Sequence, residues 1–247
     1  TAPSEVKERF KDVPDFNIDP LTDDPALVTA VTSMWPQLQT HAEALHRQWM
    51  PKYPYYDSTT YDLEVLVRFV SGDAIKRHAE MRGVQGRYDD PNPKILLLCA
   101  VPDMLRLTTC LTHELGHHFK HMTGPSNDNY PLAYWLQTEV AAEQLVVESH
   151  GLEGLTHNRI CSAPARAQIH RLLIAEEDRD DEDIRRASGH FVCTRDTGLE
   201  AYALVNELVR LGRWTFGELL HMNDRAFRDA LLSSPDLWVQ DASEAQA

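Results

Sequence analysis

Two histidines and a glutamate at close spacing are the residues of this chain best suited to do chemistry. They lie in the run His-Glu-Leu-Gly-His at positions 113–117. On a helix, side chains four positions apart stand one above the other, so His113 and His117 can bind one divalent cation at about 2.0 to 2.1 Å each. Glu114 lies on a neighbouring part of that face, where a carboxylate can take a proton from a water on the cation. The run therefore predicts a catalytic metal site with Glu114 as general base.

A catalytic zinc site also needs a third protein ligand and one open position. The downstream side chains able to ligate a metal are Glu139, Glu143, Glu148, His150 and His157. Glu139 and Glu143 lie four positions apart in TEVAAEQ, and the two alanines between them allow another helix to approach closely. We assign Glu139 to the metal and Glu143 to the second ring N–H of a ligand histidine. The alternative interpretation is that both are surface glutamates on an exposed helix face.

Other histidines and tyrosines near the motif carry less specific signals. His118 points about 100° round the helix from His117 and cannot share its metal, and His121 lies one turn further on. We expect structural roles for both, because a catalytic zinc takes three protein ligands. Three further side chains could stabilise an oxyanion, and spacing does not choose among them: Tyr130, Tyr134 and His150.

The pattern around the motif predicts the helices that must position it. Apolar residues at helical spacing predict one helix over residues 102–122, which carries the motif. A second helix is expected from about 131 to 150, with a proline in its first turn and a glycine just past its end. It carries the two glutamates. A further helix is expected over residues 25–50, and Thr215 and Glu218 have the spacing of a capping box.

Two segments before the motif have the patterns of strands. Residues 63–69 alternate between apolar and polar side chains. The run KILLLC at 94–99 follows the turn-rich DDPNP, which predicts a hairpin whose second strand is buried on both faces. We expect residues 94–99 to form the sheet edge nearest the cleft, where an extended peptide could pair with them. The expected fold class is α+β, with a small mainly antiparallel sheet.

The overall composition limits the classes of partner. The chain has 247 residues and a formal net charge of -14, and an acidic surface repels phosphate backbones, so direct nucleic-acid binding is disfavoured. Its four cysteines form no CxxC pair, so a cysteine zinc site is not indicated. Neither an apolar signal segment nor a run of membrane-spanning length is visible, and we expect a cytoplasmic protein that enters no membrane. The acidic run at 176–183 is expected to be a solvated surface or linker.

The motif and its spacing resemble known metallopeptidases. HExxH, followed 22 positions later by Glu-x-x-Ala-Glu, is similar to the gluzincins. A narrower resemblance, over about residues 80–150, is to the ImmA/IrrE-type metallopeptidases. It rests on HELGHxxxH, which here runs from His113 to His121, and on the preceding GRYDDPNPKILLLC. The chain departs from that family after Glu139, where it reads VAAEQLVVESHG in place of an Asn and an apolar run.

The resemblance implies a gluzincin-type zinc metallopeptidase with one Zn²⁺ per chain, held by His113, His117 and Glu139. Glu143 would support a ligand histidine, and Glu114 would activate a water for hydrolysis of a peptide or protein substrate. The domains expected are an N-terminal arm and helical segment at 1–60, a zincin-like catalytic core at 61–150, and a helical C-terminal region at 151–247. A second hypothesis is a zinc-containing regulatory or partner-binding protein with little turnover, such as a stress or repressor-removal regulator.

Overall fold

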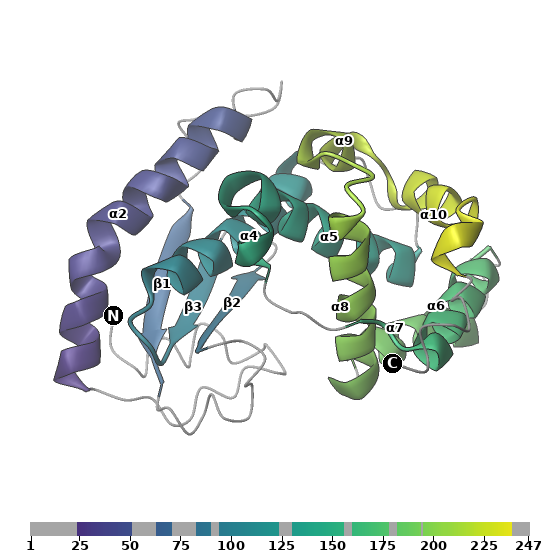
Figure 1. Cartoon of the computed structure of the whole chain (residues 1–247), viewed down its shortest axis with the longest axis horizontal. Helices are drawn as coiled ribbons and strands as arrows, with labels where there is room; N and C mark the ends of the chain where they lie inside the picture. Colours follow the sequence, from purple (N-terminus) through teal and green to yellow (C-terminus); the bar gives the residue numbers. More distant parts are fainter. Residues whose placement is uncertain are drawn as a thin grey trace. The chain divides into compact units, whose positions relative to one another are not determined.

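The chain divides into two compact units, and the boundary between them falls inside one helix. The computed structural model describes residues 24–50, 63–70, 83–89, 94–123, 130–155, 160–177, 182–193 and 195–238. The units are Thr1–Leu115, which we call the sheet unit, and Gly116–Ala247, which we call the helical unit. Helix α4 (Met104–Thr123) is continuous across the boundary and belongs to both (Figure 1).

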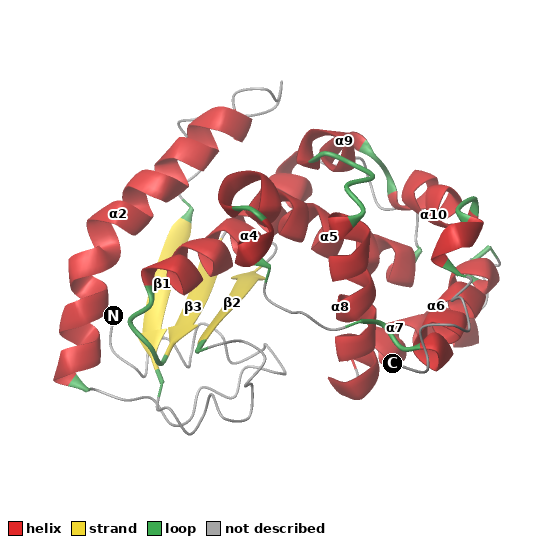
Figure 2. Cartoon of the chain, in the orientation of Figure 1, coloured by secondary structure: helices red, strands yellow, loops and turns green. Residues whose placement is uncertain are grey.

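Three strands form the sheet of the first unit: β1 (Glu64–Phe69), β2 (Val84–Asp89) and β3 (Lys94–Cys99) (Figure 2). Their order is β1-β3-β2, with β3 parallel to β1 and antiparallel to β2. The predicted β2–β3 hairpin is thus confirmed. The sheet is mixed, and the expectation of a mainly antiparallel sheet is wrong, because β3 inserts between the two earlier strands and the long connection after β1 permits a parallel pair.

The position of β3 also corrects the expected sheet edge. β3 is paired along all six residues with both neighbours, so it is the central strand and offers no free edge to a peptide. Its last five residues are buried, as predicted. A continuous apolar run is typical of a strand covered on both faces, and such a strand is more stable in the middle of a sheet than at its edge.

Helix α2 (Pro25–Trp49) completes the described part of the sheet unit. The carboxylate of Asp24 accepts a hydrogen bond from the backbone N–H of Ala26 at 2.9 Å and so caps the helix start. The apolar face of α2 is buried at Leu27, Val31, Leu38, Leu45 and Trp49. His41 Nε2 and Thr112 Oγ1 lie 2.7 Å apart, and this hydrogen bond joins α2 to α4. The helix predicted over residues 25–50 is therefore confirmed.

Helix α5 (Pro131–His150) is the centre of the helical unit, and its bounds match the prediction. It contacts every other α-helix that the structure describes after it: α6 (Ala163–Ala175), α7 (Glu182–Cys193), α8 (Arg195–Arg210), α9 (Phe216–His221) and α10 (Asp224–Leu232). Two short 3₁₀ turns, η3 (Leu152–Gly154) and η4 (Pro235–Leu237), complete the unit. The predicted capping box is present at the start of α9, where Thr215 and Glu218 exchange hydrogen bonds.

One acidic residue contradicts the prediction of a solvated run at 176–183. Glu176 is buried, and its carboxylate accepts hydrogen bonds from the backbone N–H groups of Leu132 at 2.7 Å and Ala133 at 3.3 Å. These are orphan donors in the first turn of α5, where the helix dipole favours a negative charge. Burial nevertheless raises the pKa of Glu176, and the two backbone hydrogen bonds oppose that shift. Glu176 therefore ties the end of α6 to the start of the glutamate-bearing helix.

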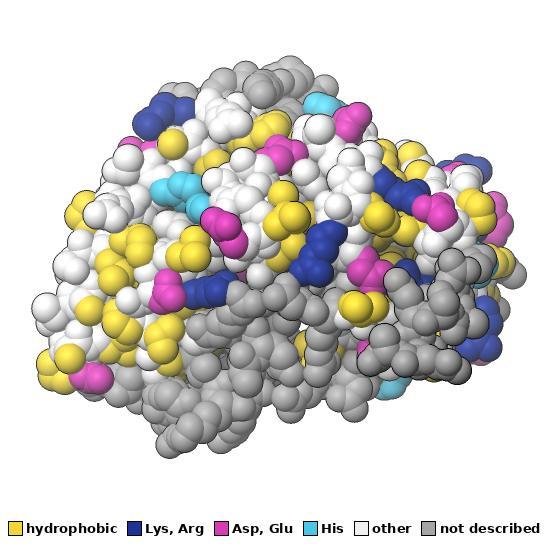
Figure 3. Space-filling view, viewed as in Figure 1, with side chains coloured by type: hydrophobic (Ala, Val, Ile, Leu, Met, Phe, Trp, Pro, Cys, Tyr) yellow, Lys and Arg dark blue, Asp and Glu magenta, His cyan; other side chains and the backbone are white. Residues whose placement is uncertain are grey.

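Two surface features bear on possible partners. No helix within the described ranges is both long enough and apolar enough to cross a membrane. On the face drawn in Figure 3, Lys and Arg side chains lie beside Asp and Glu side chains in several places, and the coloured residues form no continuous basic patch there.

Candidate metal centre

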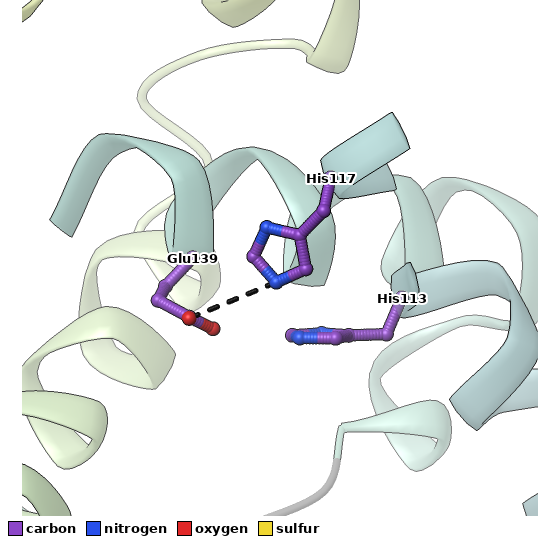
Figure 4. A group of neighbouring side chains, drawn as sticks. All are labelled: His113, His117 and Glu139. Atoms are coloured by element: carbon purple, nitrogen blue, oxygen red, sulfur yellow. Dashed lines mark ion pairs between the residues drawn. The ribbon is translucent and has the colours of Figure 1, made fainter. Parts of the chain in front are cut away.

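Helix α4 fixes the two histidines of the motif relative to each other. Asp103 caps its start by accepting a hydrogen bond from the backbone N–H of Arg106 at 3.1 Å. The apolar stripe predicted from the sequence is buried at Leu107, Leu111 and Leu115. With that stripe covered, His113 and His117 lie one turn apart on another part of the helix surface (Figure 4).

Close packing of α4 against α5 brings the third candidate ligand to His117. A methyl carbon added at Gly116 would lie only 2.6 Å from Cα of Ala142, so the two helices approach as closely as a glycine allows. One turn before Ala142, the carboxylate of Glu139 points toward His117, with Oε1 3.7 Å from Nε2 (Figure 4). The close helix approach predicted from the two alanines between the glutamates is present at Ala142. Gly116, which the HELGH run itself contains, is the partner that the sequence reasoning missed.

The three side chains fit a divalent cation. One ligand atom from each of His113, His117 and Glu139 lies within 4.8 Å of the others. A tetrahedral zinc with bonds of about 2.0 to 2.1 Å would hold its ligand atoms about 3.3 Å apart. Small side-chain rotations are therefore enough to bring the three ligand atoms to that separation. His117 and Glu139 retain 18% and 13% side-chain exposure, which leaves access for an ion and a substrate. Two imidazoles and one carboxylate are a donor set typical of catalytic zinc.

Glu114 lies beside the ligands in sequence but is buried against the sheet. Its residue exposure is 5%, and its carboxylate lies close to Gly86 of β2. Within the helix it follows His113 directly, so it lies about 100° round α4 from that ligand. Its predicted role as a general base is compatible with this position and stays a prediction.

Glu143 accepts a hydrogen bond that the sequence did not indicate. It is completely buried, and its Oε1 accepts a hydrogen bond from the hydroxyl of Tyr202 on α8 at 2.7 Å. The ring of Tyr202 packs edge-on against Trp135 of α5, which holds the hydroxyl in place. Support of a ligand histidine by Glu143 stays a prediction. A lone tyrosine in a helical segment gave no signal that it would meet this carboxylate.

The alternative third ligands are engaged elsewhere or lie outside the described residues. Glu148 accepts a hydrogen bond from the backbone N–H of Phe216 at 2.7 Å, so its carboxylate supports the first turn of α9. His150 is half-buried, and burial lowers the pKa of its imidazole. His157 lies outside the described residues. Of the five candidates, the structure therefore brings Glu139 to the histidine pair.

Two polar side chains, Lys120 on α4 and Gln137 on α5, connect the helices that carry the candidate ligands to the end of α9. Nζ of Lys120 donates to the carbonyls of Leu219, Leu220 and Met222 at 2.9, 3.3 and 2.7 Å. Nε2 of Gln137, on α5, donates to the same Met222 carbonyl at 2.6 Å. Each ligand-bearing helix thus sends one side chain to the end of α9. Burial lowers the pKa of Lys120 to about 8, against the opposing effect of the Asp224 carboxylate.

The chain matches no family model, no curated protein and no solved structure. The metal centre therefore rests on the chemistry and positions of its own side chains. Those side chains establish a group on α4 and α5 that can hold a metal ion. The identity of the metal and the reaction follow only by inference from the donor set and the motif.

Proposed function

We propose that this protein is a zinc-dependent metallopeptidase that hydrolyses peptide bonds in a protein substrate. The observation that carries the proposal is the meeting of Glu139 with the HExxH histidines, with 3.7 Å between Glu139 Oε1 and His117 Nε2. Nitrogen and carboxylate donors in a three-residue set favour zinc with an open coordination position. A zinc ion bound there would polarise a scissile carbonyl and acidify a water molecule.

Glu114 is the proposed general base. It lies between the two histidines in the motif, on the part of α4 next to the ligand pair. Its carboxylate would accept a proton from the attacking water and later deliver that proton to the leaving amine. Because the carboxylate is nearly buried, few bulk waters can compete for it, and its hydrogen-bond geometry is restricted.

The place of β2 at one end of the described strand order suggests how an extended substrate would bind. In the order of the described strands β2 stands at one end, with β3 on one side and its other edge facing away from the described sheet. An extended peptide could add to that edge by main-chain hydrogen bonds. This would place the substrate backbone alongside the strand on which Glu114 packs, and it favours an unfolded segment or loop as substrate.

The test combines metal analysis with a single isosteric substitution. Wild-type protein and Glu114→Gln should each retain about one zinc per chain, because Glu114 is not a ligand. A library of peptides incubated with the zinc-loaded wild type should yield cleavage products by mass spectrometry. Glutamine has nearly the same shape but cannot accept the proton, so the variant should cleave about a hundred- to ten-thousand-fold more slowly.

Two outcomes would contradict the proposal. Equal cleavage by Glu114→Gln would remove Glu114 from the reaction. Full zinc occupancy with no cleavage by the wild type would favour a metal-containing regulatory protein instead. As a matched control, His113→Ala should lose the metal and the cleavage together, which separates loss of the base from loss of the ion.

A further inference from the structure

Gly86 lies where β2 passes the carboxylate of Glu114. A methyl carbon added at Gly86 would stand 2.5 Å from Oε1 and 2.6 Å from Cγ of Glu114. It would also stand 2.8 Å from Sγ of Cys110, which lies one turn before Glu114 on α4. Real Cβ atoms essentially never approach other heavy atoms within 3.0 Å. Any side chain at this position must therefore displace Glu114, Cys110 or both.

Backbone conformation does not explain this glycine. Gly86 lies in the middle of β2, paired with Leu97 of β3, and its backbone is extended. Gly83, just before the strand, differs in having a φ of 92°, a conformation that does require glycine. A glycine inside a strand weakens the strand, because it gives up side-chain packing and costs more backbone entropy. The feature that Gly86 supplies is space.

We infer that Gly86 is a positioning residue for Glu114. The missing side chain leaves a slot in β2, and the carboxylate of Glu114 lies against it, with Cys110 beside it on the same helix face. Confinement in this slot restricts the rotamers of Glu114, which is 5% exposed. The role of Glu114 as a base rests on the proposed function, but the contact between Gly86 and Glu114 does not.

A double-mutant cycle on the full chain tests the contact. Gly86→Ala, Glu114→Ala and the double variant are compared with the wild type by thermal unfolding. Overpacking should make Gly86→Ala melt roughly 2 to 12 °C below the wild type. Shortening Glu114 to alanine removes the two nearest of the three atoms that the new methyl group meets and leaves Cys110 Sγ at 2.8 Å, so a large part of this loss, but not all of it, should disappear in the Glu114→Ala background.

A second measurement, of zinc content and peptide cleavage, detects a displaced Glu114 even if the stability of the variant is unchanged. Gly86→Ala should keep its zinc, because it changes no ligand, while kcat for peptide cleavage falls about 100-fold as the base moves. The matched control is Gln85→Ala, one residue away on the opposite face of β2. It should leave the zinc content and kcat unchanged. The change in melting temperature that it causes should be the same in the wild type and in Glu114→Ala.

The outcomes separate this inference from the proposed function. A Gly86→Ala loss that is as large in the Glu114→Ala background as in the wild type, together with unchanged kcat in Gly86→Ala, overturns the positioning role. A wild type that cleaves no peptide overturns the proposed hydrolysis, and the coupling of melting temperatures then still decides whether Gly86 positions Glu114. A smaller Gly86→Ala loss in the Glu114→Ala background than in the wild type, or loss of kcat with zinc retained in Gly86→Ala, supports the inference.

Discussion

The two units that meet within α4 differ in how they position the candidate site residues. In the sheet unit, the side chain of Glu114 is positioned by packing, because it occupies the space beside Gly86 that a side chain there would fill. In the helical unit, close packing of Gly116 against Ala142 is joined by directed hydrogen bonds, with Lys120 and Gln137 both bound to the end of α9. The directed hydrogen bonds suit a metal site, because metal ligands must meet within a few tenths of an ångström.

The largest expected effect is the loss of metal when Glu139, the candidate ligand on α5, is removed. Glu139→Ala should purify without zinc, because it removes one of the three proposed ligands. Glu143→Ala should bind zinc about 10- to 100-fold more weakly, as is typical when a residue that orients a ligand is lost. Metal titration of both proteins decides the order. Zinc retained in Glu139→Ala but lost in Glu143→Ala would move the ligand to Glu143.

The Lys120 contacts should appear as a pH dependence of stability. The pKa of Lys120 is lowered to about 8 in the folded chain, while the unfolded chain has the ordinary value of 10.5. Between these two values the unfolded state binds more protons, so the free energy of unfolding contributed by this group rises with pH. The full change is roughly 3 kcal/mol as an upper limit. Below pH 8 the amine is charged in both states and this contribution is constant.

Lys120→Met isolates this contribution from the other groups that titrate at alkaline pH. Burial raises the pKa of Cys99 to about 11, so the thiol ionises at lower pH in the unfolded chain than in the folded chain. This ionisation lowers the free energy of unfolding above pH 9. Urea unfolding of wild type and variant between pH 7 and 10 should therefore be compared as a difference. The variant should be less stable at pH 7, because three carbonyls lose a donor, and the difference should widen as pH rises. A constant difference would show that the lysine does not titrate in this range.

Close helix packing can be challenged with a single methyl group. Gly116→Ala should lower the free energy of unfolding by about 1 to 3 kcal/mol, although alanine favours helices, because the neighbouring atom is backbone and cannot rotate away. Gly189→Ala on α7 is the matched control, since a methyl group there meets nothing within 4 Å. It should raise the free energy of unfolding by about 0.5 to 1 kcal/mol. If both variants are stabilised equally, Gly116 does not lie as close to Ala142 as described here.

Local sequence patterns predicted the parts of the site that depend on one element. Periodicity and terminal residues gave α4 and α5, and the four-residue spacing placed His113 above His117. Glu139 was assigned from its position after the motif, and the structure brings it to His117. The same patterns could not show β3 in the middle of the sheet, because strand order depends on which distant segments pair. Nor could they show that Lys120 meets carbonyls about a hundred positions later in the chain.

The smallest expected effect concerns the Tyr202 hydroxyl and tests whether directed hydrogen bonds extend to Glu143. Tyr202→Phe keeps the ring contact with Trp135 but removes the donor 2.7 Å from Glu143 Oε1. Loss of one hydrogen bond to a buried carboxylate should lower the free energy of unfolding by about 1 to 2 kcal/mol. In a Glu143→Ala background the same substitution should be nearly neutral, because no carboxylate remains to accept the bond. Urea unfolding of the four proteins measures this coupling. An equal loss in both backgrounds would mean that Tyr202 contributes through packing alone, and Glu143 would then be held, as Glu114 is, by the shape of its surroundings.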